Sequence, residues 1–469
     1  MTVNPARMRI LVVTAAFPPD GAVGSLRTLR LLKYLARTGS EAQVLTICPD
    51  TYRAGTVIDA ELLSQVPKEV CVVRARAVRP IDWLGARLRR SPIGRSGAQV
   101  HPLNGAAGGA RAFAVSVPIR SLQRVCSAVL TLPDREAGWI LPAVARGWAS
   151  ARAYGRPDVI YSSGPPYSAH VVAACLASLM RRPWVADFRD PWARAPWRDD
   201  RFRFEKRAWS ILERWFVTQA NAVVFVTEAN RADFAAHYGE TLARRFHVVP
   251  NGCDLGDFHH LVPGPPSDRF VLLHAGSLYG ARDPSPMLRV IADTVASGTI
   301  DARGFRMRLI GRVGVPGVDL HGLVRNLGIE AIVEVIPHMP RRMVLQQMLD
   351  ASALLVVQPV TKVSVPAKLY EYLAAGRPIL ALAEPDGATA ALVAESGAGI
   401  AVSPADEAGI KRALVQLVAG GFRRPHIDRS LYDGALRAAE LGAILQGIAC
   451  NGRVEDARSP AVPISTEPS

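Results

Sequence analysis

Apolar runs and amphipathic segments alternate along most of the chain. Short apolar runs predict buried strands in its first half at residues 8–17, 42–48, 158–163, 184–188, 222–227 and 246–250. A second series of such runs follows at residues 270–275, 305–310, 333–336, 353–357, 378–383 and 399–402. Helical patterns lie between them, as in 25–38, where leucines recur every three residues and Ser25 can cap the helix. This alternation, repeated twice, predicts an α/β fold with two doubly wound, Rossmann-like parallel sheets.

The two series are separated by a stretch rich in Pro and Gly, and 469 residues are too many for one core. After the second series comes one more amphipathic helix, and then a charged end rich in Pro and Ser. We therefore predict an N-terminal domain over 1–258, a linker over 259–268, a C-terminal domain over 269–424, a further helix over 425–449 and a disordered tail over 450–469.

Segment 365–380 predicts a short helix between two buried strands. Pro366 suits the first helical turn, where a missing N–H costs little, and Gly376 suits a left-handed stop. Leu369 and Leu373 are four residues apart and can pack inward. The helix therefore has a defined start, a defined end and one buried side.

The other side of this predicted helix carries Lys368, Glu371 and Tyr372. A cation and a carboxylate at the mouth of a strand–helix unit lie where open α/β sheets bind ligands. A surface ion pair with the same spacing is the alternative interpretation.

The loop after the first strand, 17–25, contains Gly21 and Gly24 and ends at Ser25. Glycines let the backbone approach a ligand closely, and a helix N-terminus at Ser25 favours a phosphate. The loop does not match the glycine pattern of dinucleotide-binding folds. A tight turn without a ligand is the alternative.

Two further groups of polar residues follow predicted strands. Asp187, Arg189 and Asp190 lie at the end of the 184–188 strand, where charges are costly to place unless they are paired or used. A structural Asp–Arg bridge would also explain them. Gly276 and Arg282 follow the 270–275 strand, and a guanidinium beside a glycine turn suits a diphosphate. A surface arginine beside a loop is the alternative there.

The net charge of +15 is distributed unevenly. Residues 83–133 contain no Asp or Glu and seven arginines, and their middle is rich in Gly. We predict a basic loop insertion that faces an anionic membrane surface or another polyanion. A general enrichment in arginine accounts for part of the excess.

The six cysteines have no paired spacing, which predicts reduced thiols rather than a disulfide framework or a zinc site. The N-terminus leads into a strand without a leader pattern, and no apolar stretch approaches the roughly 18 residues of a membrane span. We therefore expect a cytoplasmic protein, peripheral at the inner face of the plasma membrane if the basic insertion binds lipid.

As a set, six segments carry a resemblance to a known family: 17–21, 157–166, 185–192, 249–254, 275–278 and 366–378. The chain resembles glycosyltransferases of the GT-B fold in the retaining family 4 group, and most of all the bacterial members that build polysaccharides and the cell envelope. The resemblance extends from residue 8 to about residue 445 in the order of the family. It implies a nucleotide-sugar donor bound mainly by the second domain and an acceptor bound mainly by the first.

The resemblance also implies roles for single residues of the second domain. Arg282 would neutralise the donor diphosphate with help from Lys368. Glu371 matches the second glutamate of the E-x7-E motif of the family, which binds the donor ribose. Backbone at 336–338, with His338, would hold the base.

In the first domain, loop 21–24 and Ser25 would meet the diphosphate from the opposite side. The family often has a histidine where this chain has Arg189, so Asp187, Arg189 and Asp190 are the candidates for residues around the reacting carbon. The helix over 425–449 fits the GT-B habit of crossing back onto the first domain.

One departure from the family concerns the first glutamate of the motif. Val363 stands in its place, so the usual contact to the donor sugar is absent. GT-B members need no bound metal, and no D-x-D motif argues otherwise. We therefore expect no metal and no cofactor, with the nucleotide sugar as substrate.

The predicted function is a metal-independent, retaining glycosyltransferase, of hexosyl or related type, that acts on a glycan or lipid-linked acceptor. A nucleotide-sugar epimerase of the same fold is the near alternative. A basic nucleic-acid-binding protein is the alternative from another class, but no helix-turn-helix or basic strand with interleaved aromatics supports it. We expect no nucleic-acid partner, and the oligomeric state is left open.

Overall fold

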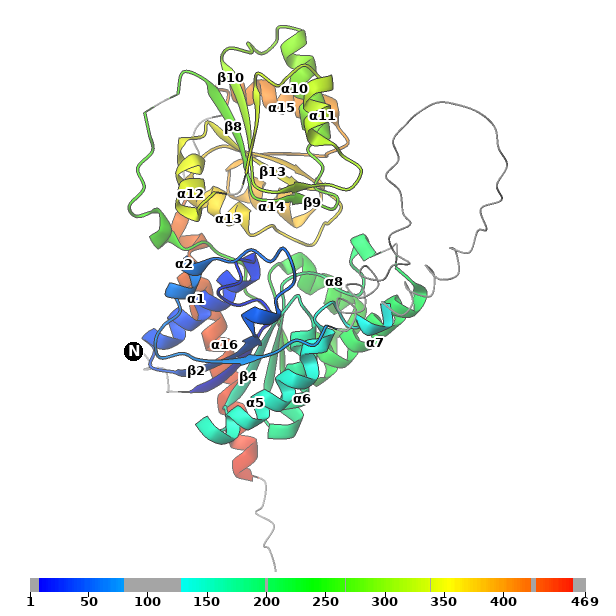
Figure 1. Ribbon diagram of the computed structural model, residues 1–469, viewed down its shortest axis with the longest axis vertical. Helices are drawn as coiled ribbons and strands as arrows, with labels where there is room; N and C mark the ends of the chain where they lie inside the picture. The colour runs from blue at the N-terminus through cyan, green and yellow to red at the C-terminus, as the bar shows by residue number, and fades with distance from the viewer. Residues whose placement is uncertain are drawn as a thin grey trace, which may run out of the picture.

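A computed structural model describes residues 8–79, 128–198, 201–265, 267–337, 339–422 and 427–458. It contains two α/β domains that lie one above the other in Figure 1. Residues 83–127 of the predicted basic insertion and residues 459–469 of the predicted tail lie outside the described residues.

The N-terminal domain is built on a sheet of seven parallel strands in the order β3-β2-β1-β4-β5-β6-β7. The strands are β1 (Arg9–Val13), β2 (Glu41–Ile47), β3 (Cys71–Ala75), β4 (Val159–Gly164), β5 (Trp184–Phe188), β6 (Ala222–Phe225) and β7 (Phe246–Val248). The described helices of the domain are α1 (Val23–Arg37), α2 (Ala60–Ser64), α5 (Ile140–Tyr154), α6 (Ser168–Met180), α7 (Arg203–Gln219), α8 (Glu228–Tyr238) and α9 (Glu240–Ala243).

The C-terminal domain has six parallel strands in the order β12-β10-β8-β13-β14-β15. They are β8 (Phe270–Ala275), β10 (Phe305–Ile310), β12 (Val333–Ile336), β13 (Ala353–Gln358), β14 (Ile379–Ala383) and β15 (Gly399–Val402). A small parallel pair joins β9 (Leu278–Tyr279) to β11 (Val313–Gly314). The helices are α10 (Ser285–Ala296), α11 (Leu320–Asn326), α12 (Arg341–Asp350), α13 (Lys368–Ala375), α14 (Ala388–Glu395) and α15 (Glu407–Val418).

Each sheet has helices on both faces, which explains the continuous apolar runs in the sequence. Strands β4, β5, β13 and β14 are buried along their whole length. In the N-terminal domain, one face packs against α5, α6 and α7, and the other packs against α1 and α16 (Gly434–Arg458). This double cover is the physical requirement for a parallel sheet, and it confirms the predicted fold class.

The last described helix, α16, returns to the N-terminal domain, as Figure 1 shows in red. It packs along α1 and buries Leu441 and Leu445 against Leu31 and Leu32. It begins later than the predicted helix, because a turn of 3-10 helix, η6 (Arg429–Tyr432), occupies the residues before it. It also ends later, so the prediction that the tail begins at residue 450 was wrong for the segment up to residue 458. That segment contains Ala, Glu and Arg, which have favourable helix propensities.

Among the described residues, no helix combines the length and the apolar character that a membrane crossing requires.

Candidate active site

The helix at the centre of the sequence analysis, α13, follows β13 as predicted. Leu369 and Leu373 are fully buried, and Gly376 ends the helix with φ +64°. Tyr372, which the helical spacing placed on the ligand side, is also fully buried, and its hydroxyl accepts a hydrogen bond of 2.7 Å from the Ala275 amide. That placement of Tyr372 was wrong, because the turn of the helix over it packs on β8 and β13 instead of facing the space between the domains.

Lys368 lies at the start of α13, close to the end of β8. Its Nζ is 3.1 Å from Nε2 of the buried His274. A Cβ on Gly276, which has φ +113°, would lie 2.8 Å from the same Nζ, so only glycine leaves room for the amine. Burial lowers the pKa of Lys368 to about 7, with a further contribution from the nearby Arg282 and an opposing one from Glu371.

Arg282 follows the short strand β9 and stands beside this amine. Its Nε donates a hydrogen bond of 3.0 Å to Oε1 of Gln358, the last residue of β13. Its guanidinium carbon lies 4.6 Å from the centre of the Tyr279 ring. The predicted cations Arg282 and Lys368 thus meet at the carboxyl ends of β8 and β13, as expected for a site that binds an anion.

The end of β5 carries a buried charge network in the N-terminal domain. The Asp187 carboxylate is fully buried and accepts hydrogen bonds from Arg27 at 2.9 and 3.0 Å, from Tyr161 at 2.7 Å and from Ser163 at 2.9 Å. Burial alone would raise the pKa of Asp187, but the Arg27 guanidinium outweighs it and the pKa is lowered. The structural Asp–Arg bridge considered above is therefore present, and it uses Arg27 instead of Arg189.

Arg189 follows the same strand, but its side chain pairs with groups other than Asp187. Its side chain donates hydrogen bonds to the carbonyl oxygens of Gly164 and Pro165. Its guanidinium lies directly over Gly24, where a Cβ would overlap Nη1. The first turn of α1 and the end of β5 are in contact here, so two groups that were predicted separately belong to one site.

Asp190 connects this site to the other domain. Its backbone carbonyl accepts a hydrogen bond of 2.7 Å from the Tyr167 hydroxyl. Burial raises the pKa of its carboxyl, while Arg189 and Arg282 oppose that increase. Arg282 of the C-terminal domain is thus close enough to Asp190 to favour the charged form of its carboxyl.

The glycine loop after β1 differs from its predicted role in two details. The Gly21 amide donates a hydrogen bond of 2.8 Å to the carbonyl of Val57, so it is not available to a phosphate in this conformation. Ser25 does not cap α1, which begins at Val23. Its buried hydroxyl donates to the Asp20 carbonyl at 2.8 Å. The N-terminal turn of α1 is therefore held by Asp20 and its loop.

Glu371 is engaged in an ion pair within the C-terminal domain. Its carboxylate lies 2.8 Å from Nη1 of Arg341, whose other nitrogens pair with Asp257 at 2.8 and 2.9 Å. Burial lowers the pKa of Arg341, but Glu371 and Asp257 outweigh it, so the pKa is raised. A ribose that binds Glu371 would share the carboxylate with Arg341.

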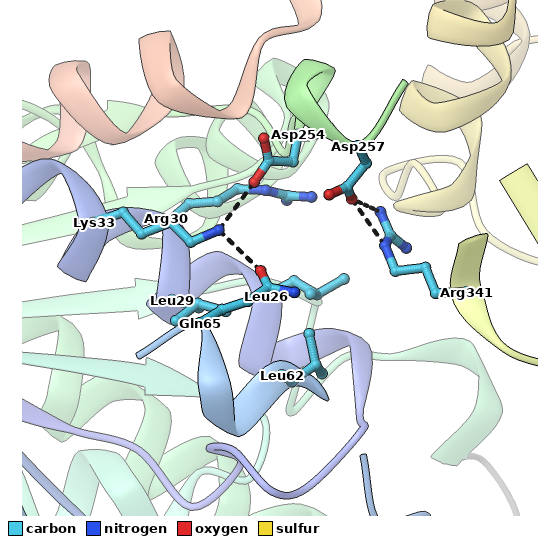
Figure 2. Close-up of a pocket in the computed structure, with 9 residues that line it drawn as sticks. All are labelled: Leu26, Leu29, Arg30, Lys33, Leu62, Gln65, Asp254, Asp257 and Arg341. Atoms are coloured by element: carbon cyan, nitrogen blue, oxygen red, sulfur yellow. Dashed lines mark hydrogen bonds and ion pairs between the residues drawn. The ribbon is translucent and has the colours of Figure 1, made fainter. Parts of the chain in front are cut away.

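These groups belong to an interdomain charge cluster, which we define as Arg30, Lys33, Asp254, Asp257, Arg341 and Glu371. Figure 2 shows Lys33 between Asp254 and Gln65, and Arg341 directed at Asp257. The cavity among them is about 10 Å³, which is room for one water molecule. It is therefore too small for a sugar nucleotide, and the cluster acts in this conformation as a contact between domains.

A second contact between the domains lies at Thr227, the N-cap of α8. Its hydroxyl donates to the carbonyl oxygen of Val363 and accepts a hydrogen bond of 3.1 Å from the Asn230 amide. Val363 is the position at which the resemblance would place the first glutamate of the E-x7-E motif. In this chain, its backbone instead connects the C-terminal domain to the N-terminal domain.

The remaining predicted group, His338, lies outside the described residues. Within the part of the chain that the structure describes, no three His, Cys, Asp or Glu side chains are grouped so that they could hold a metal ion. The cysteines of that part are all free thiols.

Four residues that the structure brings into or beside the site were not predicted from the sequence: Arg27, Thr227, His274 and Arg341. His274 had a readable signal, because a histidine at the end of an otherwise apolar strand must find partners when buried. The others had none, since their partners across the structure are 30 or more residues away in the sequence.

The arrangement brings together three cationic side chains, Lys368, Arg282 and Arg189, and one carboxyl group, Asp190, at facing strand ends. Cations in a partly dry setting bind phosphate oxygens strongly, and they can stabilise charge that develops on a leaving diphosphate.

Comparison with known proteins agrees with this geometry. Residues 93–257 match the family model of Glycosyltransferase Family 4. No curated protein sequence matches the chain. The sucrose-phosphate synthase of Thermosynechococcus elongatus has the same fold, with a TM-score of 0.57 at 14% identity over 97% of this chain and 100% of that chain.

Two further solved structures are similar. Anabaena HepE, determined in complex with UDP and glucose, superimposes with a TM-score of 0.52 at 17% identity, over 97% of this chain and 100% of HepE. A UDP-N-acetylglucosamine 2-epimerase assigned in Listeria monocytogenes has a TM-score of 0.51 at 9% identity, over 96% of this chain and 98% of that chain. At such identities the similarity shows the fold alone.

Residues 93–257 thus resemble Glycosyltransferase Family 4, and the chain as a whole has the two-sheet GT-B fold of these solved structures.

Proposed function

We propose that this chain transfers a sugar from a nucleotide-sugar donor to a glycan or lipid-linked acceptor. The observation that carries the proposal is the meeting of Lys368 and Arg282 at the ends of β8 and β13, opposite Arg189 and Asp190. In the transfer, the bond from the anomeric carbon to the diphosphate oxygen breaks, and a bond to an acceptor hydroxyl oxygen forms. The nucleoside diphosphate leaves, and the acceptor hydroxyl loses its proton.

The leaving diphosphate gains charge as this bond breaks. Arg282 can donate a two-pronged hydrogen bond to its oxygens, and Lys368 adds a point charge. The N-terminus of α1 and the Arg189 guanidinium would stabilise it from the other domain. These side chains supply the charge for which other transferases use a metal, so we propose a metal-independent reaction without a cofactor.

A uridine nucleotide is the first donor to test, because Anabaena HepE binds UDP and UDP-glucose within the same fold. Retention of the anomeric configuration is proposed from the resemblance to family 4. The sugar that we propose to be transferred from such a donor is a hexose or a related sugar.

The acceptor side rests on the N-terminal domain. The Asp190 carboxyl interacts electrostatically with Arg189 and Arg282, and the burial that raises its pKa suits a group that exchanges a proton with an acceptor hydroxyl. Asp187 is enclosed by its partners, so it would act by holding Arg27, Tyr161 and Ser163 in place.

The setting proposed for this reaction is the inner face of the plasma membrane, in the synthesis of a polysaccharide or a cell-envelope glycan. The basic stretch 83–133 supports it, since seven arginines without a carboxylate attract anionic lipid. We propose no nucleic-acid partner.

An epimerase of the same fold is the second candidate, because a chain assigned as an epimerase shares this architecture. An epimerase binds the same nucleotide sugar but alters the configuration of the sugar and transfers nothing.

A donor panel separates these candidates. Purified protein is incubated with several nucleotide sugars and a bacterial lipid extract, and mass spectrometry follows the nucleoside diphosphate, the glycosylated lipid and the configuration of the sugar. Release of diphosphate with a glycosylated product supports the transferase, and an altered nucleotide sugar supports the epimerase. Arg282→Gln should abolish either reaction, whereas the exposed Arg303→Gln should leave it unchanged. The proposal is overturned if the protein neither binds nor turns over any of the donors.

A further inference from the structure

The outward face of α7 is unusual for a water-soluble surface. Phe204, Ile211 and Trp215 lie on it at spacings of seven and four residues, with 38%, 61% and 37% of their surface exposed. These spacings place the three side chains on one stripe of the helix. The exposed apolar side chains of α7 therefore lie along one side of the helix, which we call the apolar band, instead of being scattered around it.

The apolar band continues before the helix begins. Phe202 is 41% exposed and stacks on Phe204 with 5.6 Å between ring centres. Trp197, in the turn that precedes it, is 48% exposed. Figure 1 shows α7 at the outer edge of the N-terminal domain, where α6 and β5 are its packing neighbours.

The charges on α7 are sorted between its two faces. Arg203, Arg207 and Arg214 are exposed beside the apolar band. The only two carboxylates in α7, Glu205 and Glu213, are 2% and 1% exposed.

Both carboxylates are engaged on the inner face of the helix. Glu213 accepts hydrogen bonds of 2.8 Å from the Ala193 amide, the Arg194 guanidinium and the Tyr238 hydroxyl. Glu205 accepts one of 3.2 Å from the Phe202 amide at the start of the helix. The outward face of α7 therefore presents arginine and aromatic side chains and no carboxylate.

We propose that this face of α7 docks on an anionic lipid bilayer, with the helix lying in the plane of the interface. Aromatic rings favour the boundary between headgroups and acyl chains, and arginines beside them pair with lipid phosphates. The inference concerns described residues that are distinct from the basic stretch 83–133. It does not depend on the transferase reaction, because lipid binding is measured without a donor.

Two other occupants fit the face less well. A second copy of the chain, paired about a two-fold axis, would bring the same arginines against one another without a carboxylate to neutralise them. A nucleic acid would be attracted by the arginines but would leave Ile211, which cannot stack on a base, facing a polar backbone. Charge and shape together favour lipid.

The test is flotation of the full chain with vesicles, comparing phosphatidylcholine alone with a mixture that contains phosphatidylglycerol. The apolar variant is Phe204→Ser, Ile211→Ser and Trp215→Ser in combination. Its control carries Leu141→Ser, Tyr154→Ser and Val262→Ser, which remove three apolar side chains elsewhere that are even more exposed than those on α7. Circular dichroism establishes that each variant is folded.

The charge variant combines Arg203→Gln, Arg207→Gln and Arg214→Gln. Its control combines Arg303→Gln, Arg325→Gln and Arg342→Gln, all exposed in the C-terminal domain. Each arginine removed from α7 should weaken binding to the anionic vesicles about fivefold. The C-terminal control should bind like the unchanged chain.

The proposal stands if both α7 variants lose binding to anionic vesicles while both controls retain it. It is overturned if the α7 variants float as well as the controls, which would leave the basic stretch as the lipid contact. Two other results overturn it equally. In one, light scattering detects a dimer, and in the other the chain forms a salt-sensitive complex with RNA. In both, the α7 variants abolish that association but still bind lipid.

Discussion

Nζ of Lys368 lies 3.1 Å from Nε2 of His274, and this contact determines which nitrogen of the histidine carries its proton. Nδ1 of His274 lies 2.9 Å from the carbonyl oxygen of Leu355, which can only accept, so Nδ1 is the donor. Burial, and next the charge of Lys368, lower the pKa of His274 well below its usual value, so the ring is neutral. Nε2 is therefore an acceptor, and it directs the amine of Lys368 toward Gly276 and Arg282.

The first prediction concerns the pH dependence of diphosphate binding. The pKa of Lys368 is about 7 in the free protein, and a bound diphosphate would raise it. Below pH 7 the amine is already charged, so the affinity for UDP should be constant. Above pH 7 binding must take up a proton, and the affinity should fall by up to about tenfold per pH unit.

Calorimetry in buffers of different ionisation enthalpy measures this proton uptake directly. Lys368→Met should remove the pH dependence and weaken binding, whereas Lys411→Met, an exposed lysine paired with Asp293, should preserve both. If the proton uptake persists in Lys368→Met, another group takes up the proton.

The same pKa has a consequence for stability in the absence of ligand. Between pH 7 and the ordinary lysine pKa, the unfolded chain binds a proton at Lys368 that the folded chain does not. The free energy of unfolding should therefore increase with pH across this window, since the unfolded state carries the larger number of protons. Urea unfolding of the wild-type chain and Lys368→Met at several pH values isolates the contribution, which should vanish in the variant.

The second prediction uses the contact between Arg189 and Gly24. A Cβ at residue 24 would overlap the Arg189 guanidinium, so Gly24→Ala must displace that side chain from its carbonyl partners. Overpacking of this kind costs about 1–3 kcal/mol, and misplacing a charged group beside the reacting atoms should lower kcat about a hundredfold. Gly314→Ala is the control, because a Cβ there meets nothing within 4 Å. Equal kcat for the two variants would exclude Arg189 from the reaction.

The third prediction tests the enclosed Asp187. Asp187→Asn leaves Arg27 buried without its charge partner, which should cost about 3–5 kcal/mol of unfolding free energy. Because the pKa of Asp187 is lowered, its contribution is complete above the ordinary Asp pKa and is lost as the pH falls through the folded value. The difference between wild type and variant should therefore shrink in acid. Asp293→Asn, at an exposed ion pair, should leave urea unfolding unchanged.

The helix α13 was predictable because its determinants are local. Its stop at Gly376 and its buried pair Leu369 and Leu373 depend on spacing within one segment. Strand β3 was not predicted, because it lies at the edge of its sheet, is only partly buried, and contains Arg74, which interrupts its apolar run. The strength of the local pattern thus follows the degree of burial of the element.

The partners of the charged residues could not be predicted from local pattern. The pairing of Asp187 with Arg27 joins residues 160 positions apart, and that of Glu371 with Arg341 joins two helices. Helical spacing placed Tyr372 beside Glu371 but could not show that β8 covers it. Topology predicts which strand ends form the site. Which of several arginines pairs with a given carboxylate depends on packing, which local sequence does not show.

The last prediction concerns the hydrogen bond from Thr227 to the carbonyl of Val363. Thr227→Val keeps the shape but removes the hydroxyl, so it breaks this interdomain bond and also uncaps α8. Loss of the cap costs about 1 kcal/mol. Loss of the interdomain bond should allow the domains to separate, which small-angle X-ray scattering measures as a larger radius of gyration without ligand. Thr227→Ser retains the hydroxyl and should behave as wild type.

Asp406→Ala separates these two effects, because it uncaps α15 within the C-terminal domain without breaking a bond between domains. It should lower the free energy of unfolding by a similar amount and leave the radius of gyration unchanged. If Thr227→Val has the radius of gyration of Asp406→Ala, the hydroxyl acts only as a cap. The interdomain charge cluster around Arg341 would then be the contact that holds the domains together.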